Sequence, residues 1–363
     1  MLGLMVVRLA CGVYTELLPE EAYYWTYAKH PAWGYFDHPP MVAWVIHFGT
    51  LFLGDTELGV RLGCILLAAV SCWLVVRVAE LWFDRRAAVM AGWMFLLVPV
   101  FLGMGFLGMP DAPLLFFWLV TLYAVSRALL EERSAWWWLA GVAYGGALLS
   151  KYYALLLGPS LLLFLLISPR YRFWLRRPQP WLAVVVALLV FSPVMVWNSQ
   201  NQWASFAFQS TRTVDQRASG WSQSLWFWLA QVLLPTPLLF VLFVMVVRRW
   251  VKCWVERSWS AVGGERWNFA VAFSLPVVAL FALASAKGAF RLNWTAPAFL
   301  SLLPAAAALL WEKLEVRSRG WRWASGVTAA ACVVVVLVAH TGMALVRVNL
   351  LGRVRFGGWH QLA

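Results

Sequence analysis

The chain has 363 residues, of which 63% are hydrophobic and only 12% are charged. Soluble globular domains carry about 25% charged residues, so this composition excludes a soluble protein. The net charge of +13 does not indicate nucleic-acid binding, because the cations lie in short segments between apolar stretches, as the positive-inside rule describes.

Apolar stretches long enough to cross a bilayer recur from one end of the chain to the other. A crossing helix needs about 20 mainly apolar residues, and these stretches are too continuously apolar to be barrel strands. The fold class is therefore an all-α integral membrane protein, a polytopic helical bundle of about eleven transmembrane helices. Residues 1–363 are expected to form a single transmembrane domain, without a soluble C-terminal domain. The predicted spans are residues 1–14, 58–80, 86–107, 113–130, 135–150, 153–168, 180–197, 225–247, 268–285, 294–311 and 321–345.

The loops between the spans indicate how the bundle is oriented. Most of the 29 Lys and Arg residues fall in alternate loops, which predicts a cytoplasmic N-terminus and an extracytoplasmic C-terminus. Two long loops, about residues 15–57 and 198–224, are then extracytoplasmic, together with short turns around Asp111, Lys151 and Lys287. The five cysteines form no paired or metal-binding spacing.

The loop at residues 15–57 is predicted to hold two amphipathic helices in the membrane interface. Pro19 suits the first turn of a helix, and Glu20 and Glu21 follow where the helix dipole favours negative charge. The same helix carries a wide aromatic face, which suits an interfacial position. This face is formed by Tyr23, Tyr24, Trp25 and Tyr27. A second helix is predicted after the two prolines at 39–40.

The ionisable residues of this loop each allow two interpretations. Glu20 and Glu21 either favour the helix start or act as a general base or as ligands of a polar acceptor. Asp37 and His38 either form a turn, which Asp and the following prolines favour, or bind substrate. A metal site formed by Glu21 and His38 is a weaker alternative, because no compact ligand motif is present.

Two strings of this loop carry a resemblance to a known family. Pro-Glu-Glu-Ala-Tyr-Tyr-Trp at 19–25, followed by Gly-Tyr-Phe-Asp-His-Pro-Pro at 34–40, resembles the first periplasmic loop of bacterial membrane glycosyltransferases of the GT-C superfamily. More closely, it is similar to the branch related to protein O-mannosyltransferases and to the lipid A aminoarabinose transferase. The resemblance covers essentially the whole chain, and the first loop is its most specific part. The further matching segments are residues 109–113, 150–152, 293–297 and 357–363.

The resemblance implies a glycosyltransferase that depends on a polyprenyl-phosphate sugar and transfers a hexosyl or pentosyl group. It would lie in the bacterial inner membrane, with its active site facing the periplasm or cell exterior. Its partners would be a polyprenyl-phosphate-linked sugar donor, a lipid (lipid A), glycan or protein acceptor, and membrane lipids, but no nucleic acid. Transfer would invert the sugar and use no nucleotide sugar. No cofactor is expected, and a divalent metal is left open. The family usually carries an Asp-Glu pair whose Asp is tied to catalysis; here Glu20 stands at the Asp position and Glu21 at the next.

The implied reaction suggests roles for the ionisable residues on the outer side. A carboxylate should take the proton of the acceptor hydroxyl, and the catalytic candidates are Glu20, Glu21 and Asp111. Cations should stabilise the leaving phosphate. The substrate-binding candidates are Lys151, Lys287, Arg291, Tyr23, Asp37, His38 and Asn293.

Structural interpretations of four of these residues stay open beside the functional ones. Lys151, and likewise Lys287 with Arg291, would snorkel to the interface, and Asp111 would cap the helix that follows it. In the functional interpretation, Lys287 and Arg291 are four residues apart and share one face of a helix, as a phosphate clamp requires.

Two other functions fit the same outer cations. A transporter or flippase for a lipid-linked sugar predicts ionisable groups at mid-membrane and broken helices, and few charges lie in the predicted span centres. A non-catalytic binder of polyprenyl phosphate is the second alternative, and the Glu at position 20 keeps it open.

Overall fold

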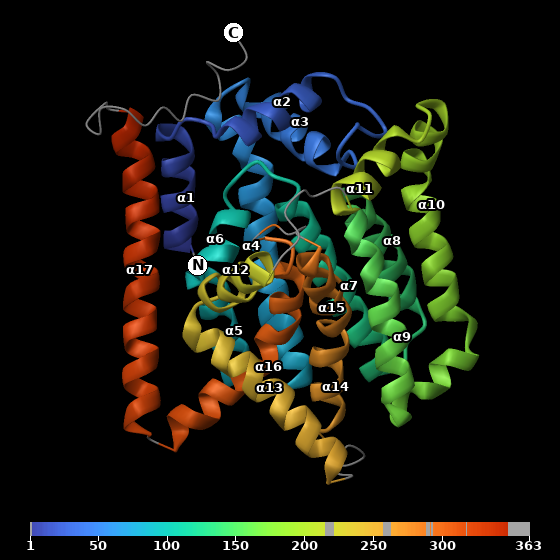
Figure 1. Ribbon diagram of the computed structural model, residues 1–363, viewed down its shortest axis with the longest axis vertical. Coiled ribbons are helices and arrows are strands. Elements are labelled where there is room, and N and C mark those ends of the chain that lie inside the picture. Colours follow the sequence, from blue (N-terminus) through green and yellow to red (C-terminus); the bar gives the residue numbers. More distant parts are fainter. Residues whose placement is uncertain are drawn as a thin grey trace.

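The computed structural model describes residues 2–214, 221–256, 263–287, 291, 293–316 and 318–347, and every regular element within them is a helix (Figure 1). The segment at 357–363 that contributes to the family resemblance lies outside these residues. The elements are α1 (Leu2–Tyr14), α2 (Pro19–Lys29), α3 (Met41–Leu53), α4 (Glu57–Trp82), α5 (Arg85–Leu97), α6 (Pro99–Met104), α7 (Asp111–Glu131), α8 (Ala135–Ser150), η1 (Tyr152–Leu156), α9 (Leu157–Ile167), η2 (Pro169–Arg176), α10 (Pro178–Gln200), α11 (Ala204–Val214), α12 (Trp221–Leu233), α13 (Pro237–Val255), α14 (Glu265–Ala272), α15 (Leu275–Ala286), α16 (Ala296–Glu315) and α17 (Arg319–Arg347).

The helices confirm the predicted class of a multi-pass α-helical membrane protein. Six helices of the described chain are long and apolar enough to cross a bilayer, or seven if the bent pair α12 and α13 is one span. The predicted count of about eleven is not confirmed. Each predicted span coincides with a helix or a helix pair, but several, such as the 13-residue α1 and the 16-residue α8, are shorter than a full crossing.

Prolines interrupt two of the predicted spans. Between residues 86 and 107, α5 ends at Leu97 and α6 begins at Pro99, because the residue before a proline avoids the α conformation. The span predicted for 225–247 is not one continuous helix. There α12 and α13 meet at an angle of 101°, where Pro235 and Pro237 flank Thr236, which has a φ of 81°.

The first long loop folds as predicted into two helices. α2 begins at Pro19 and α3 follows Pro40, and both lie across the upper end of the bundle in Figure 1. The second long loop contains α11 and the start of α12. The end of α13 and the start of α14 lie at the opposite, lower end. The upper end therefore holds the predicted site residues of the first loop, such as Glu20 and Glu21 on α2.

A buried amide joins three elements near the lower end. The Oδ1 atom of Asn268 accepts hydrogen bonds from the indole nitrogens of Trp250 at 2.9 Å and Trp254 at 3.2 Å. Its Nδ2 atom donates to the Ile167 carbonyl at 3.2 Å and to the Ser168 hydroxyl at 3.1 Å. Asn268 is 1% exposed, so this one side chain holds α13, α14 and the end of α9 together.

Replacing Asn268 by leucine is expected to destabilise the protein by about 2–4 kcal/mol, because donors on α13 and acceptors at the end of α9 lose their partner. The measurement is the thermal unfolding midpoint of the purified chain in detergent. Asn201 provides the control, because within the described residues its exposed side chain donates only to the carbonyl of Trp197 in its own helix turn. Equal midpoints for the Asn268→Leu and Asn201→Leu proteins would contradict the proposed role of the amide.

Candidate functional site

Three segments far apart in the sequence meet at one buried ion pair below the upper surface. Asp111 is the first residue of α7, Lys151 follows the last residue of α8, and Asn293 lies in the turn before α16. The Nζ atom of Lys151 lies 2.9 Å from both carboxylate oxygens of Asp111. Asn293 donates from Nδ2 to Oδ2 of Asp111 at 3.0 Å. The structure thus brings together three of the predicted site residues.

The burial and bonding of this pair argue against two structural interpretations of the sequence, snorkelling by Lys151 and helix capping by Asp111. Lys151 is 5% exposed and Asp111 is 3% exposed, so the lysine does not snorkel to the water interface. The carboxylate of Asp111 bonds two side chains from other elements rather than capping its own helix. Because its oxygens already accept three hydrogen bonds, this carboxylate is suited to holding a cation in place.

Lys151 also borders a cavity of about 390 Å³ that opens between the first loop and the bundle. The lining combines polar side chains with aromatic and aliphatic ones. It consists of His38, Lys151, Tyr152, Tyr153, Leu155, Leu156, Gln209, Leu280, Phe281 and Trp294. A cation and a histidine beside an apolar wall suit an amphiphilic ligand with a small anionic group.

The part of the first loop around Asp37 is held in place by α2 and by α11. The hydroxyl of Tyr27 donates to Oδ1 of Asp37 at 2.5 Å, and the hydroxyl of Tyr23 lies 2.5 Å from that of Tyr27. Burial, followed by the hydrogen bond to Asp37, raises the pKa of Tyr27 above its ordinary range, so this phenol stays protonated as a donor. From α11, Gln209 donates to the backbone carbonyl of Asp37.

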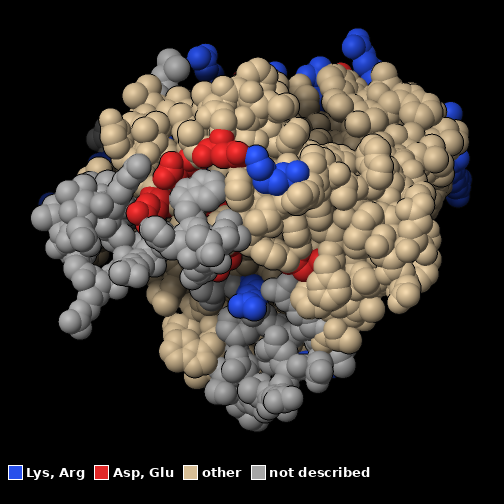
Figure 2. Space-filling model, turned by 90° about the horizontal axis from the view of Figure 1, so that it is seen from above, with Lys and Arg blue, Asp and Glu red and all other residues tan. Residues whose placement is uncertain are grey.

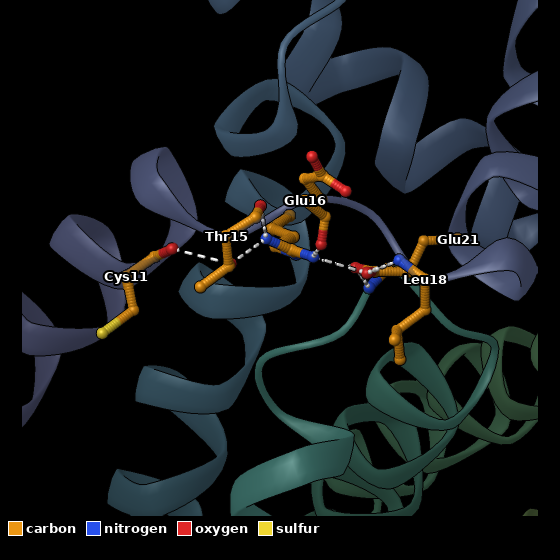
Figure 3. Close-up of polar contacts among 7 residues, drawn as sticks. Cys11, Thr15, Glu16, Leu18 and Glu21 are labelled. Atoms are coloured by element: carbon orange, nitrogen blue, oxygen red, sulfur yellow. Dashed lines mark hydrogen bonds and ion pairs between the residues drawn. The ribbon is translucent and has the colours of Figure 1, made fainter. Parts of the chain in front are cut away.

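Glu21 lies in a second buried ion pair (Figure 3). Arg61 of α4 donates from Nε to Oε1 at 2.8 Å and from Nη2 to Oε2 at 2.6 Å. The backbone N–H groups of Leu18 and Gly108 each donate to the same carboxylate at 2.9 Å. Glu21 and Arg61 are both 0% exposed, so Glu21 is a structural carboxylate in this arrangement.

The other donors of Arg61 extend this network to the end of α1. They bond the carbonyl of Thr15 at 2.8 Å, its hydroxyl, and the carbonyl of Glu16 at 2.8 Å. One guanidinium therefore joins α4 to the start of the first loop and, through Glu21, to the segment that leads into Asp111. Arg61 was not among the site residues predicted from the sequence. Its place near the start of an apolar span was the signal that it needs an acidic partner.

Glu20 has the opposite environment to its neighbour. It is exposed in the first turn of α2, and no hydrogen bond or ion pair joins its side chain to the described part of the chain. Figure 2, viewed onto this end of the molecule, shows acidic side chains at the surface beside a basic one. Of the two adjacent glutamates, Glu20 is the one that an acceptor can reach from outside.

The arrangement expected for the two remaining cations is wrong. α15 ends at Ala286, so Lys287 follows the helix and does not share a helical face with Arg291. Both side chains are exposed, and within the described ranges neither forms a hydrogen bond or ion pair with Asp111 or Lys151. They lie on the same connection as Asn293.

The alternative of a metal site at Glu21 and His38 gains no support from the geometry. The carboxylate of Glu21 is occupied by Arg61 and two backbone donors. Among the residues that the structure describes, no group of three or more His, Cys, Asp or Glu side chains is placed to hold a metal ion.

Comparisons with known proteins found similarity to one family model, to two sugar transferases and to one fold. The family model of dolichyl-phosphate-mannose-protein mannosyltransferases matches residues 37–197. The lipid A galacturonosyltransferase RgtD of Rhizobium johnstonii is 28% identical over 309 residues, which is 82% of this chain and 62% of that protein. The undecaprenyl phosphate-alpha-4-amino-4-deoxy-L-arabinose arabinosyl transferase of Erwinia tasmaniensis is 27% identical over 199 residues, which is 53% of this chain and 33% of that protein.

Solved structures show the same architecture. ArnT from Cupriavidus metallidurans in the apo state matches with a TM-score of 0.69 and 21% identity, over 90% of this chain and 61% of that one. Its complex with undecaprenyl phosphate matches with a TM-score of 0.66, 21% identity and coverage of 90% and 62%. The archaeal oligosaccharyltransferase AglB from Archaeoglobus fulgidus matches with a TM-score of 0.52 and 14% identity, over 96% and 55% of the two chains.

The chain spans 62% of the length of RgtD and 33% of the arabinosyl transferase. The matching part includes the first loop from Asp37 onward, Asp111 and Lys151. The family model, the two relatives and the fold agree, and they confirm the resemblance of this chain to membrane glycosyltransferases of the GT-C type.

Proposed function

We propose that this protein transfers a sugar from a polyprenyl-phosphate carrier to an acceptor on the extracytoplasmic side of the bacterial inner membrane. The observation that carries the proposal is the ion pair of Lys151 and Asp111 at the edge of a cavity that also contains His38. A cation held by a buried carboxylate stays in one position, as a group that stabilises a leaving phosphate must.

The proposed reaction is a single displacement that inverts the anomeric carbon. The acceptor hydroxyl oxygen forms the new bond to that carbon, and Glu20 takes the hydroxyl proton. The bond between the carbon and the phosphate oxygen breaks, and its electron pair leaves with the polyprenyl phosphate. Lys151 stabilises the charge on this phosphate.

The other site residues have supporting roles in this proposal. Asp111 and Asn293 hold the ammonium group of Lys151, and His38 faces the same cavity. Lys287 and Arg291, exposed on the connection to Asn293, are proposed to contact the phosphate from outside. The remaining candidates, Tyr23 and Asp37, are proposed to contact the sugar or the acceptor.

The test is a transfer assay with the purified chain in nanodiscs and a panel of polyprenyl-phosphate sugars, read by mass spectrometry of the freed polyprenyl phosphate. RgtD is named a lipid A galacturonosyltransferase, so galacturonosyl donors with lipid A come first, and aminoarabinosyl donors follow. Transfer without a metal is part of the proposal, and release should persist in EDTA. Loss of release in EDTA that returns with a divalent cation would overturn that part.

The assay includes two glutamine variants of neighbouring glutamates. Glu20→Gln is expected to lower the rate by about 10²–10⁴-fold, the usual contribution of a general base. Glu16→Gln is the matched control, because its side chain bonds nothing in the described chain and only its carbonyl is used by Arg61. Full activity of the Glu20→Gln protein would refute the assigned base.

A transporter or flippase of a lipid-linked sugar is the second candidate, and two observations favour it. α12 and α13 form a helix pair bent by 101°. Arg8 of α1 is 2% exposed, and its Nε and Nη2 atoms have no hydrogen-bond partner among the described residues. Movement of a labelled donor across vesicles without release of polyprenyl phosphate would favour this function over transfer.

A further inference from the structure

A short helix at the end of the molecule opposite to the site presents a row of arginines. η2 is an eight-residue 3-10 helix between α9 and α10. Its aromatic side chains Tyr171 and Trp174 are buried against the bundle. Its exposed cations are Arg170, Arg172 and Arg176, with Arg177 directly following. This helix is therefore fastened by its aromatic face and leaves its charged face uncovered.

A second group of cations lies beside this helix, at the end of α13. Arg248, Arg249 and Lys252 are exposed there. The side chain of Asn268 bonds Trp250 and Trp254 on the α13 side and Ile167 and Ser168 on the η2 side, so the two cationic segments are adjacent. The two segments together form what we call the basic surface, residues 170–177 and 248–252.

The arginines of this surface are not held in contact ion pairs. Within the described residues, none of its arginines forms an ion pair with Asp or Glu, and only Lys252 has such a contact, with Glu256 at 3.5 Å. Exposed aromatic rings stand next to the charges. Phe173 is 39% exposed and Trp181, at the start of α10, is 52% exposed. α10 itself has an apolar window of which only 28% is buried, so its outer face borders lipid.

We infer that the basic surface binds the phosphodiester headgroups of anionic phospholipids. Guanidinium groups bind phosphate oxygens in pairs, and clusters of Lys and Arg beside a membrane helix are attracted to anionic lipid. The exposed aromatic rings at the same level suit the boundary between headgroups and acyl chains. They favour a lipid over a soluble phosphate. The inference is independent of the transfer reaction proposed for the opposite end.

The experiment measures binding of phosphatidylglycerol to the full chain in nanodiscs of phosphatidylcholine, by native mass spectrometry of the lipids retained. The test variant carries Arg170→Gln, Arg176→Gln and Arg177→Gln. Arg172 is kept because it also donates to the carbonyl of Leu166. The control variant removes the same charge from three exposed arginines at the same end, by Arg85→Gln, Arg133→Gln and Arg322→Gln.

The test variant is expected to retain about tenfold less phosphatidylglycerol than the parent. The control variant is expected to retain an amount within about twofold of that of the parent. Binding should weaken as salt rises, because exposed charges are screened. Equal losses in the two variants, or equal retention of phosphatidylglycerol and phosphatidylcholine by the parent, would overturn the inference. So would displacement of the lipid by millimolar inorganic phosphate, which would indicate a site for soluble anions.

Discussion

Replacing Lys151 by methionine is expected to lower sugar transfer by about 10²–10³-fold, the usual cost of removing one group that stabilises developing negative charge. The same change should destabilise the fold, because it leaves the carboxylate of Asp111 buried with Asn293 as its single side-chain donor in the described part of the chain. Loss of one partner of a buried pair typically costs about 3–5 kcal/mol. Initial rates of polyprenyl phosphate release and thermal unfolding midpoints measure the two effects.

A double variant separates catalysis from stability. Asp111→Asn combined with Lys151→Met removes both charges, so the midpoint should recover most of its loss while transfer stays low. Lys29→Met is the control, because Lys29 pairs with Asp55 on the same face but both side chains are more than 40% exposed. Exposed pairs contribute about 0–1 kcal/mol. A double variant that regains full transfer would show that Lys151 contributes to the stability of the fold and not to catalysis.

Composition and proline positions were sufficient to predict the fold class and the first loop. A mainly apolar chain without water for its backbone must form helices, and Pro19 and Pro40 mark the starts of α2 and α3. The number of full crossings was not predictable in this way. Apolar length does not distinguish a straight span from the bent pair of α12 and α13, whose angle depends on the local backbone at Thr236.

The sequence predicted a set of site residues on one side of the membrane. It did not predict which carboxylate pairs with which cation. Alternation of loops places Asp111, Lys151 and Asn293 on the same side, which the structure confirms by joining them. Which carboxylate pairs with which cation depends on how α4, α7 and α8 pack. For this reason Arg61 and Gln209 were missed, although the first binds Glu21 and the second binds the backbone of Asp37.

Replacement by glutamine is expected to lower the unfolding midpoint at Glu21 but not at the adjacent Glu20. Glu21→Gln replaces two acceptor oxygens by one acceptor and one donor, and the new donor faces an N–H of Arg61 or of the backbone. An unpaired buried guanidinium costs about 3–5 kcal/mol, so the unfolding midpoint should fall clearly. Glu20→Gln should leave the midpoint unchanged, because the side chain of Glu20 is exposed and bonds nothing in the described chain.

Among the molecules that remain folded, Glu20→Gln should lower the transfer rate more strongly than Glu21→Gln does. Because Glu21 accepts from Gly108 ahead of Asp111, its loss should shift the position of the Asp111 and Lys151 pair and raise the KM for the donor. Arg61→Met should reproduce both effects, since it removes the other half of the same pair. If Glu21→Gln abolished kcat while leaving the midpoint and KM unchanged, Glu21 rather than Glu20 would be the base, and its pair with Arg61 would have to open during the reaction.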